Sequence, residues 1–323
     1  MIRWISALSA LLLLVAASGC EGEDGKAMGI EGGPCYGNGT CDGGLECRYG
    51  VCVNPSTAAD VVQGTDPGGT TDYGTTTDPG SGGCTTNCGE MVTVSGGSFW
   101  QGCNAEVENA CDSNEKPYHQ VTVPAFEIDE YEVTVGLYGD CVDTGSCSVP
   151  DTGTYCNWGV SGREGHPVNC ITWYQAREYC AWAGKRLCSE SEWEKASRGT
   201  DGRKYPWGNE EATCEYCVMD DGGNGCGEDS TWPVGSKPAG ASPCGAMDMS
   251  GNVWEWVEDD WHGSYNEAPT DGSAWVEDPR ASNRVERGGS FYGYDYGLRS
   301  SDRDYYDPAD VSDTVGARCC RSK

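Results

Sequence analysis

The feature that most constrains this chain is its content of 21 cysteines in 323 residues. In an exported protein, cysteines at this density indicate a framework of disulfides rather than zinc or redox chemistry. The count is odd, so at least one cysteine must have a fate other than an intrachain disulfide. The composition therefore predicts an exported, heavily crosslinked protein.

The N-terminus has the pattern of a secretory signal. Arg3 precedes an apolar run from Leu8 to Ala17, which is too short for a membrane span. Small residues stand directly before Cys20 and predict lipoprotein processing, which removes residues 1–19 and acylates Cys20. Plain cleavage nearby is the alternative, because Ala17 stands where leucine is commoner. We expect a membrane-anchored lipoprotein of the bacterial cell envelope, periplasmic or surface-exposed.

The chain is strongly acidic, with 21 basic and 51 acidic residues and a net charge of −30. Loss of residues 1–19 removes one arginine and no acid, so the mature chain carries 20 − 51 = −31. Such a protein is a poor nucleic-acid binder and attracts divalent cations. The expected partners are therefore the membrane, through the lipid, and no nucleic acid.

Composition divides the mature chain into three segments. Residues 20–53 hold Cys35, Cys41, Cys47 and Cys52 among glycines and predict a small knot that depends on its crosslinks. Residues 54–83 are rich in Gly, Thr, Asp and Pro and predict a linker. Residues 84–323 remain as the large domain.

The large domain mixes the periods of strands and helices. Strands are expected on both sides of Gly96-Gly97, near 119–123, over 126–135 and near 284–287. Thr172 and Ser189 are predicted N-caps of two short helices, the second with a capping box to Glu192. Few short helices among many short strands and long loops predict a compact α+β domain.

The stretch from Asp248 to Trp256 combines carboxylates with tryptophans. A carboxylate held among tryptophans needs a partner, because an unpaired buried charge is very costly. A hard cation is one solution, since Asp248 and Glu255 supply carboxylates and Gly251 and Val253 can offer carbonyl oxygens. A core strand in which Glu255 pairs with an arginine is the other, and the residues alone leave both open.

Several stretches occur together and in order in the formylglycine-generating enzyme (sulfatase-modifying factor) family, which the chain resembles over about residues 88–321. The matching stretches are Gly96-Gly97, 115–121, 166–169, 182–187, 192–194, 205–208, 251–256, 284–290 and 316–319. The resemblance implies an irregular C-type-lectin-like fold that is rich in loops.

The resemblance also implies particular residues. It places a structural calcium on Asp248, Gly251, Val253 and Glu255, and a disulfide between Cys180 and Cys319. A second calcium site would fall near Cys214 and Cys226, so a disulfide between them is expected to replace that ion. Proximity further suggests the pairs Cys103–Cys111, Cys141–Cys147 and Cys156–Cys170, whereas Cys188–Cys320 and Cys217–Cys244 are guesses, because connectivity does not follow from sequence.

The copper-dependent chemistry that the resemblance implies needs two cysteine ligands, and this sequence has no cysteine at either position. Oxidases of the family hold copper(I) on two cysteines, and the corresponding positions are Gly293 and Leu298. Iron-dependent relatives use histidines of another domain, and we expect His119, His166 and His262 to be turn or packing residues. Ser290 lacks a nucleophile elbow. The sequence therefore predicts no copper or iron.

The segment after Ser290 is the remaining candidate surface, because tyrosine gives binding loops large contact area at low entropic cost. The members of this predicted binding loop are Ser290, Tyr292, Tyr294, Tyr296, Arg299, Arg303, Tyr305 and Tyr306. They predict a floor for a peptide or glycan. The alternative is that the arginines pair with nearby acids and the tyrosines pack.

These observations predict an envelope-anchored, calcium-stabilised and disulfide-rich binding or scaffold module, a pseudoenzyme of its family. The alternative is an active enzyme that oxidises or otherwise modifies protein cysteines.

Overall fold

The computed structural model describes residues 46–48, 51–53, 83–84, 88–108 and 110–323. The chain divides into two units, residues 1–71 and 72–323. In the first unit, β1 (Glu46–Arg48) and β2 (Val51–Val53) form an antiparallel hairpin that sets residue 47 opposite residue 52. The predicted signal peptide, the acylated Cys20, the rest of the predicted knot and nearly all of the predicted linker lie outside the described residues.

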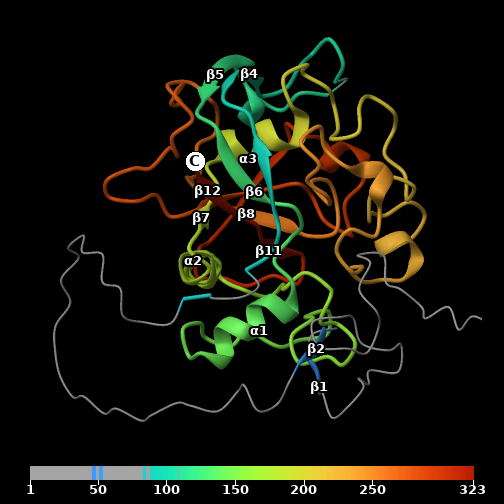
Figure 1. Ribbon diagram of the computed structural model, residues 1–323. Coiled ribbons are helices and arrows are strands. Elements are labelled where there is room, and N and C mark those ends of the chain that lie inside the picture. Colours follow the sequence, from blue (N-terminus) through green and yellow to red (C-terminus); the bar gives the residue numbers. More distant parts are fainter. Residues whose placement is uncertain (1–45, 49–50, 54–82, 85–87, 109) are drawn as a thin grey trace, which may run out of the picture. The chain divides into compact units, whose positions relative to one another are not determined.

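The second unit contains two four-stranded sheets and a two-stranded one (Figure 1). The first sheet has the order β3 (Met91–Val94), β6 (Phe126–Asp129), β12 (Cys319–Ser322), β7 (Arg186–Leu187). The second has the order β10 (Arg303–Tyr306), β9 (Arg284–Arg287), β8 (Trp254–Asp260), β11 (Val315–Ala317). β8 and β11 are parallel, and all other neighbouring strands in these two sheets are antiparallel. A hairpin of β4 (Gly97–Gln101) and β5 (His119–Val123) completes the strands.

The helices are short, and two of them begin where the sequence predicts. α2 (Trp173–Trp182) is capped by Thr172, whose hydroxyl accepts the Gln175 N–H at 3.1 Å. α3 (Glu190–Arg198) begins with the predicted capping box, in which Glu192 reaches back to the Ser189 N–H at 2.9 Å. The 3₁₀ turns are η2 (Ser113–Glu115), η3 (Asn224–Gly227), η4 (Pro238–Gly240) and η5 (Asp295–Leu298). The predicted α+β, loop-rich class is confirmed.

One prediction of an element is wrong. The strand expected over 126–135 ends at Asp129, and α1 (Val135–Asp143) follows it. Thr134 caps this helix by accepting the Leu137 N–H at 3.1 Å. None of the helices in the described part of the chain has the length and apolar character needed to cross a bilayer.

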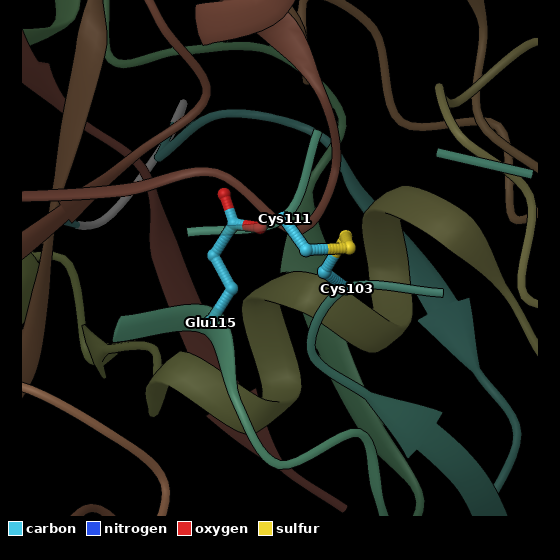
Figure 2. A group of neighbouring side chains, drawn as sticks. All are labelled: Cys103, Cys111 and Glu115. Atoms are coloured by element: carbon cyan, nitrogen blue, oxygen red, sulfur yellow. A yellow bond between two sulfur atoms is a disulfide. The ribbon is translucent and has the colours of Figure 1, made fainter. Parts of the chain in front are cut away.

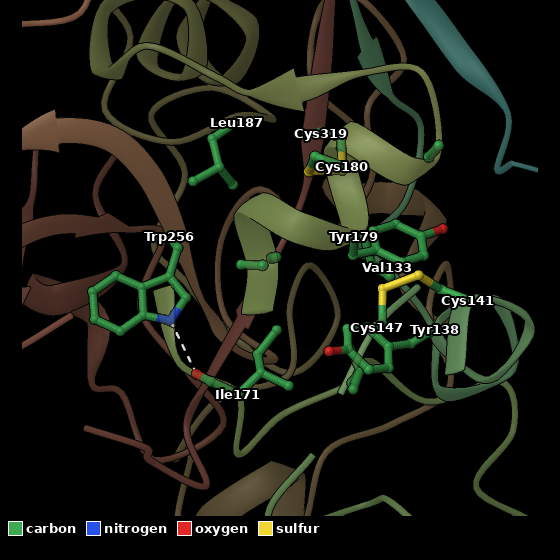
Figure 3. Close-up of a cluster of buried hydrophobic side chains, with 14 of the residues drawn as sticks. Val133, Tyr138, Cys141, Cys147, Ile171, Tyr179, Cys180, Leu187, Trp256 and Cys319 are labelled. Carbon is green, nitrogen blue, oxygen red and sulfur yellow. Dashed lines mark hydrogen bonds between the residues drawn. A yellow bond between two sulfur atoms is a disulfide. The ribbon is translucent and has the colours of Figure 1, made fainter. Parts of the chain in front are cut away.

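Two hydrophobic clusters hold the sheets and helices together. In the first, Tyr138 of α1 stacks on Tyr179 of α2, with ring centroids 5.6 Å apart, and Trp256 of β8 donates its indole N–H to the Ile171 carbonyl (Figure 3). In the second, Trp193 of α3 packs with residues of β6 and β9. The side chains of β8 thereby face both clusters, so this strand occupies the centre of the domain.

Seven disulfides crosslink the described residues. They are Cys84–Cys88, Cys103–Cys111, Cys141–Cys147, Cys156–Cys170, Cys180–Cys319, Cys188–Cys320 and Cys214–Cys226. The sequence named all of these except the first. The guessed pair Cys217–Cys244 is wrong, because both cysteines are free. Cys217 is buried with Tyr205 and Met219, whereas Cys244 packs against the cluster around Trp193, so different cores hold the two sulfurs.

Candidate functional site

The stretch from Asp248 to Glu255 surrounds a buried cluster of charges. Arg318, directly before β12, donates to both oxygens of Glu255, with its Nη2 2.8 Å from Oε1 and its Nε 2.9 Å from Oε2. The indole N–H of Trp193 donates to Glu255 Oε2 at 2.7 Å. Pairing with an arginine, the second interpretation of Glu255, is therefore observed.

The other carboxylates of this cluster, Asp248 and Glu132, accept hydrogen bonds but form no ion pair with an arginine or lysine of the described residues. Asp248 accepts the Gly235 N–H at 2.6 Å, and Glu132 accepts the Val253 N–H at 3.1 Å. Burial raises the pKa of Glu132 well above its usual range, and the nearby charges of Asp248 and Glu255 raise it further. Burial also raises the pKa of Asp248 to about 6. The arginine thus faces more carboxylates than it can neutralise, which is a favourable charge environment for a divalent cation.

The backbone of this stretch is tightly constrained. Asp248 and Asn252 have φ of 57° and 61°, and Gly251 has φ of 81°. A Cβ on Gly251 would lie 2.4 Å from the Val218 carbonyl oxygen, so only glycine fits there. The four calcium ligands named from the sequence therefore lie on one rigid turn and the start of β8. Of them, Glu255 is already committed to Arg318 and Trp193.

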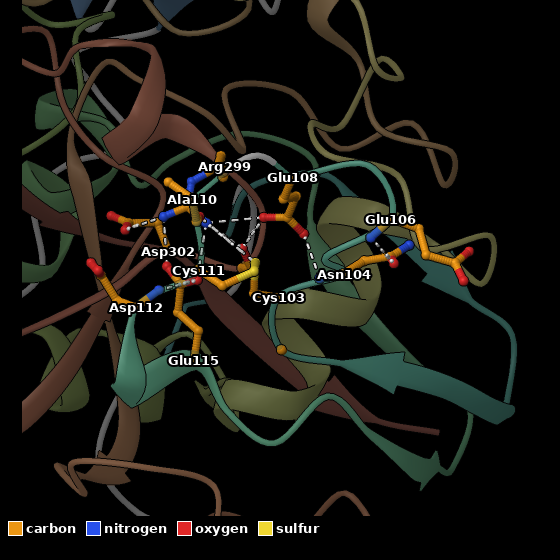
Figure 4. Close-up of a disulfide and its surroundings, with 12 residues drawn as sticks. Cys103, Asn104, Glu106, Glu108, Ala110, Cys111, Asp112, Glu115, Arg299 and Asp302 are labelled. Carbon is orange, nitrogen blue, oxygen red and sulfur yellow. Dashed lines mark hydrogen bonds and ion pairs between the residues drawn. A yellow bond between two sulfur atoms is a disulfide. The ribbon is translucent and has the colours of Figure 1, made fainter.

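The group formed by Cys103, Cys111 and Glu115 has ligand atoms close enough for a metal ion (Figure 2). Its sulfurs form a disulfide, and Glu115 binds the guanidinium of Arg299, whose Nη2 is 2.6 Å from Oε1 (Figure 4). Burial nevertheless raises the pKa of Glu115. This group is a structural crosslink beside an ion pair, because neither sulfur has a thiolate to offer.

The arginines of the predicted binding loop are not part of a binding floor. Arg299 is buried and pairs with Glu108, Glu115 and Asp302. Arg303 is buried as well, and its Nε lies 2.6 Å from Oε1 of Glu190. Ser290 is also buried. The prediction that these residues form one surface with the tyrosines is therefore wrong, because the acids of η2 and α3 neutralise both guanidinium groups.

The tyrosines of the loop lie in separate places. Tyr294 and Tyr296 are exposed and stack on each other, with centroids 6.2 Å apart. Tyr292 is half-buried, edge-on to Tyr155. Tyr305 and Tyr306 are exposed at the end of β10. Tyr305 and Tyr306 line a pocket whose other residues were not predicted as a site.

Gly293 and Leu298, the positions that the resemblance assigns to the copper cysteines, are closely packed. The side chain of Leu298 is fully buried. A Cβ added to Gly293 would lie 3.0 Å from Leu298 Cδ2 and 2.9 Å from the Ser290 carbonyl oxygen. The Gly293 N–H donates to that carbonyl at 2.7 Å and closes a tight turn. A side chain at residue 293 would therefore require the turn to move.

The three histidines of the large domain have unrelated surroundings. His119 bonds the Pro117 carbonyl, and His262 stacks on Trp275 and contacts Glu277. Burial, with a smaller contribution from the charge of Arg163, lowers the pKa of His166 to about 4. Neither group of side chains in the described residues whose ligand atoms lie close enough to hold a metal ion contains a histidine.

The sequence missed one feature, the environment of Glu286 on β9. Glu286 lines a pocket of about 490 Å³ together with Trp254, Asp304 and Tyr306. Its Oε2 is buried and has no hydrogen-bond partner. The sequence pattern that could have indicated it is Arg284-Val285-Glu286-Arg287. All four residues of this strand are buried, so each of its charged side chains needs a partner.

Comparison with known proteins identifies the relatives of the large domain. Residues 78–323 match the family described as "Sulfatase-modifying factor enzyme 1-like domain". Hercynine oxygenase of Mycobacterium tuberculosis is 36% identical over 189 residues, which is 49% of this chain and 43% of that protein. Formylglycine-generating enzyme of Thermomonospora curvata is 37% identical over 145 residues, 41% of this chain and 46% of that protein.

Serine/threonine-protein kinase Pkn1 of Chlamydia trachomatis is 32% identical over 249 residues, which is 72% of this chain and 38% of that protein. The chain thus spans less than half the length of these curated relatives. The solved structure of PvdO from Pseudomonas aeruginosa is similar with a TM-score of 0.64 and 31% identity, covering 73% of this chain and 95% of that one. Treponema denticola variable protein 1, at 23% identity and a TM-score of 0.56, shares the fold.

Proposed function

This chain belongs to the family of sulfatase-modifying factor enzyme 1-like domains, and from that premise we propose that it is a binding or scaffold module without copper-dependent oxidase chemistry. The observation that carries the proposal is the packing of Gly293 and Leu298. Copper(I) needs soft sulfur ligands. Here a buried leucine occupies one ligand position, and the turn at the other has no space for a side chain.

The free cysteines of the described residues do not replace that pair. Burial raises the pKa of the Cys217 thiol to about 12, so the thiolate is a minor species at neutral pH. Cys244 packs in a different cluster and contacts the Ser242 hydroxyl and the Ala196 carbonyl. A linear dithiolate site therefore has no second ligand in this part of the chain.

The experiment is an oxidase assay with copper(I), oxygen and a cysteine-containing peptide, read by mass spectrometry of the aldehyde product. The enzyme from Thermomonospora curvata serves as the positive control. We expect no aldehyde above background and no stoichiometric copper after desalting. Aldehyde formation, or retention of copper at one equivalent, would overturn the proposal and support an active enzyme that modifies protein cysteines.

We propose in addition that calcium stabilises the turn before β8. Asp248 and the carbonyl groups of Gly251 and Val253 would hold the ion, and Glu255 would share an oxygen between the ion and Arg318. The excess of carboxylates over arginine supports this, together with the raised pKa of Asp248. A bound calcium would supply positive charge and tie the turn to the strand.

Asp248→Asn is the informative variant for the calcium proposal, because Glu255 also holds Arg318 and Trp193 and its loss would disturb folding by itself. We expect calcium near one equivalent by elemental mass spectrometry, a lower melting temperature in EGTA, and loss of both effects in Asp248→Asn. The exposed control Asp310→Asn should keep both. A melting temperature that EGTA does not change, together with no calcium in the protein, would refute the calcium site and leave the fold as described.

We propose further that Cys20 carries the lipid that anchors the protein in the envelope. The basis is the signal pattern of residues 1–20. Labelled fatty acid should be incorporated into the wild type and not into Cys20→Ser. Equal labelling of both would refute the assignment.

A further inference from the structure

The pocket beside Glu286 is lined by residues of the sheet β10-β9-β8-β11 and of the segment after β10. Its volume is about 490 Å³, within the usual range for small-molecule sites. Its lining includes Trp254, Glu286, Asp304, Tyr306 and Asp307 and contains no lysine or arginine. The pocket is thus both acidic and aromatic.

The strand register brings the key side chains to one face of the sheet. Glu286 is paired with Asp304 across β9 and β10 and with Trp256 across β8 and β9. Residues directly opposite on neighbouring strands share a face, and so do residues two apart on one strand. Trp254, Glu286, Asp304 and Tyr306 therefore present their side chains to the same side.

Glu286 is the unusual member of this set. Only 4% of its surface is exposed, and its buried Oε2 has no hydrogen-bond partner among the described residues. Arg284 lies on the same strand and face but is paired with Asp260, its Nη1 2.7 Å from Oδ1. Burial, with a smaller contribution from the charge of Asp304, raises the pKa of Glu286 to about 8. A buried polar group without a partner is costly, so this position lacks a donor.

The missing donor is better supplied by an organic cation than by a metal ion. Among the described residues, Glu286, Asp304 and Asp307 do not form a group whose ligand atoms all lie within 4.8 Å of one another. Their oxygens therefore do not converge as the coordination shell of a metal ion requires. Aromatic faces attract alkylammonium groups through the ring quadrupole, and Trp254 and Tyr306 can supply such faces. The aromatic walls have no comparable role around a hydrated metal ion.

We propose that this pocket binds an alkylammonium group, with Glu286 and Asp304 as its charge partners and Trp254 and Tyr306 as its aromatic walls. The group is carried by a free amine or by a lysine side chain of a partner protein. This inference goes beyond the lack of oxidase chemistry and stands whether or not the domain is an enzyme.

Titration calorimetry of the purified protein with n-butylamine, and with a lysine tripeptide blocked at both ends, tests the proposal. The neutral isostere n-butanol controls for apolar binding. The variants are Glu286→Gln and Asp304→Asn, and Asp310→Asn is the matched control, because Asp310 is an exposed acid outside the pocket. Circular dichroism and melting temperature verify that each variant folds.

We expect saturable binding of at least one ammonium probe and none of n-butanol. An ammonium group beside Glu286 favours its ionised form, so binding releases the proton that burial favours in the free protein. Glu286→Gln cannot ionise and should weaken binding by at least about tenfold, as the loss of a desolvated charge partner does, and Asp310→Asn should leave it unchanged. Tighter binding of the tripeptide identifies a lysine of a protein as the source, and equal or tighter binding of butylamine identifies a free amine. No saturable binding of either probe, or binding that Glu286→Gln does not weaken, would overturn the proposal.

Discussion

Replacement of Arg318 by methionine removes the central cation of the domain. The Arg318 side chain is buried, and it donates to Glu255 and to the carbonyl oxygens of Asp129, Glu130 and Met247. Methionine fills a similar volume but has no donor. The variant therefore leaves a carboxylate and several carbonyl groups without partners in the interior.

The expected loss of stability follows from these contacts. Breaking a buried ion pair by removing one partner costs about 3–5 kcal/mol. The unsatisfied carbonyl groups each add about 1–3 kcal/mol where water cannot reach them, although such costs are not additive. A loss of about 3–5 kcal/mol is thus a lower estimate, and it is a large part of the roughly 5–15 kcal/mol by which domains are stable. Arg318→Lys keeps the charge and should lose less.

The assay is equilibrium unfolding in urea at pH 7, with disulfides intact. Arg321→Met is the matched control, since Arg321 lies in β12 three residues later and pairs with Glu127 at the exposed surface. Arg318→Met should lose its stability or fail to fold, whereas Arg321→Met should be close to wild type. Equal midpoints for the two variants would refute the reasoning. If Arg318→Met is insoluble, Arg318→Lys with a wild-type midpoint would refute it equally.

The pH dependence of the free energy of unfolding provides a second test of this prediction, because Arg318 lies beside Asp248 and other buried carboxylates. The folded-state pKa of Asp248 is about 6, above its usual value of 3.8, so the folded protein binds the extra proton between these values. In the calcium-free protein, with EGTA present, its contribution to stability is therefore present below about pH 4 and is lost as pH rises through about 6. Without Arg318 this effect should grow, so the cost of Arg318→Met should be larger at pH 7 than at pH 5. A cost independent of pH would show that lost packing, and not charge, is responsible.

The remaining predictions concern other sites of the domain. Because the pKa of Glu286 is about 8 in the folded state and 4.5 ordinarily, wild type should lose stability as pH rises from about 5 to about 9, and urea unfolding of Glu286→Gln should show a smaller loss. Leu298→Ala should lower the free energy of unfolding by about 2–5 kcal/mol, because Leu298 is fully buried; a loss no greater than that of an exposed substitution would contradict this packing. Removal of the Cys180–Cys319 disulfide by paired serines should cost about 2–3 kcal/mol, because Cys188–Cys320 still joins the same two segments and only a loop of about ten residues is released; an unchanged melting temperature would contradict that crosslink.

The sequence predicted best those features that depend on local chemistry. The N-caps at Thr172 and Ser189 appeared where expected, the second with its predicted capping box, because a cap needs only residues a few positions apart. α1 was missed, since it contains Gly136 and Gly139 and its propensity is low. Burial of Tyr138 and Cys141 on one face stabilises that helix through tertiary contacts, which a local pattern does not show.

The candidate site was predicted less well, because pairing between distant residues decides which charges are available to a ligand. Arg299 and Arg303 looked like binding residues in a tyrosine-rich segment. Their partners Glu115 and Glu190 stand 184 and 113 residues away in sequence, so nothing local marked these arginines as neutralised. The resemblance to a family assigned the positions of the copper ligands to Gly293 and Leu298, and the structure shows that both residues are closely packed.

Two buried glutamates of one sheet show where a ligand should be sought. Glu255 pairs in register with Arg287 on one face and is satisfied by Arg318, whereas Glu286 pairs with Trp256 on the opposite face and has no donor. Burial opposes the charge of both carboxylates, so the difference lies in their partners rather than in their depth. The same sheet thus supplies an arginine to Glu255, whereas no side chain of the described residues donates to Glu286 Oε2. The unsatisfied position, beside a pocket with aromatic walls, is therefore more informative about a ligand than the exposed tyrosines after Ser290.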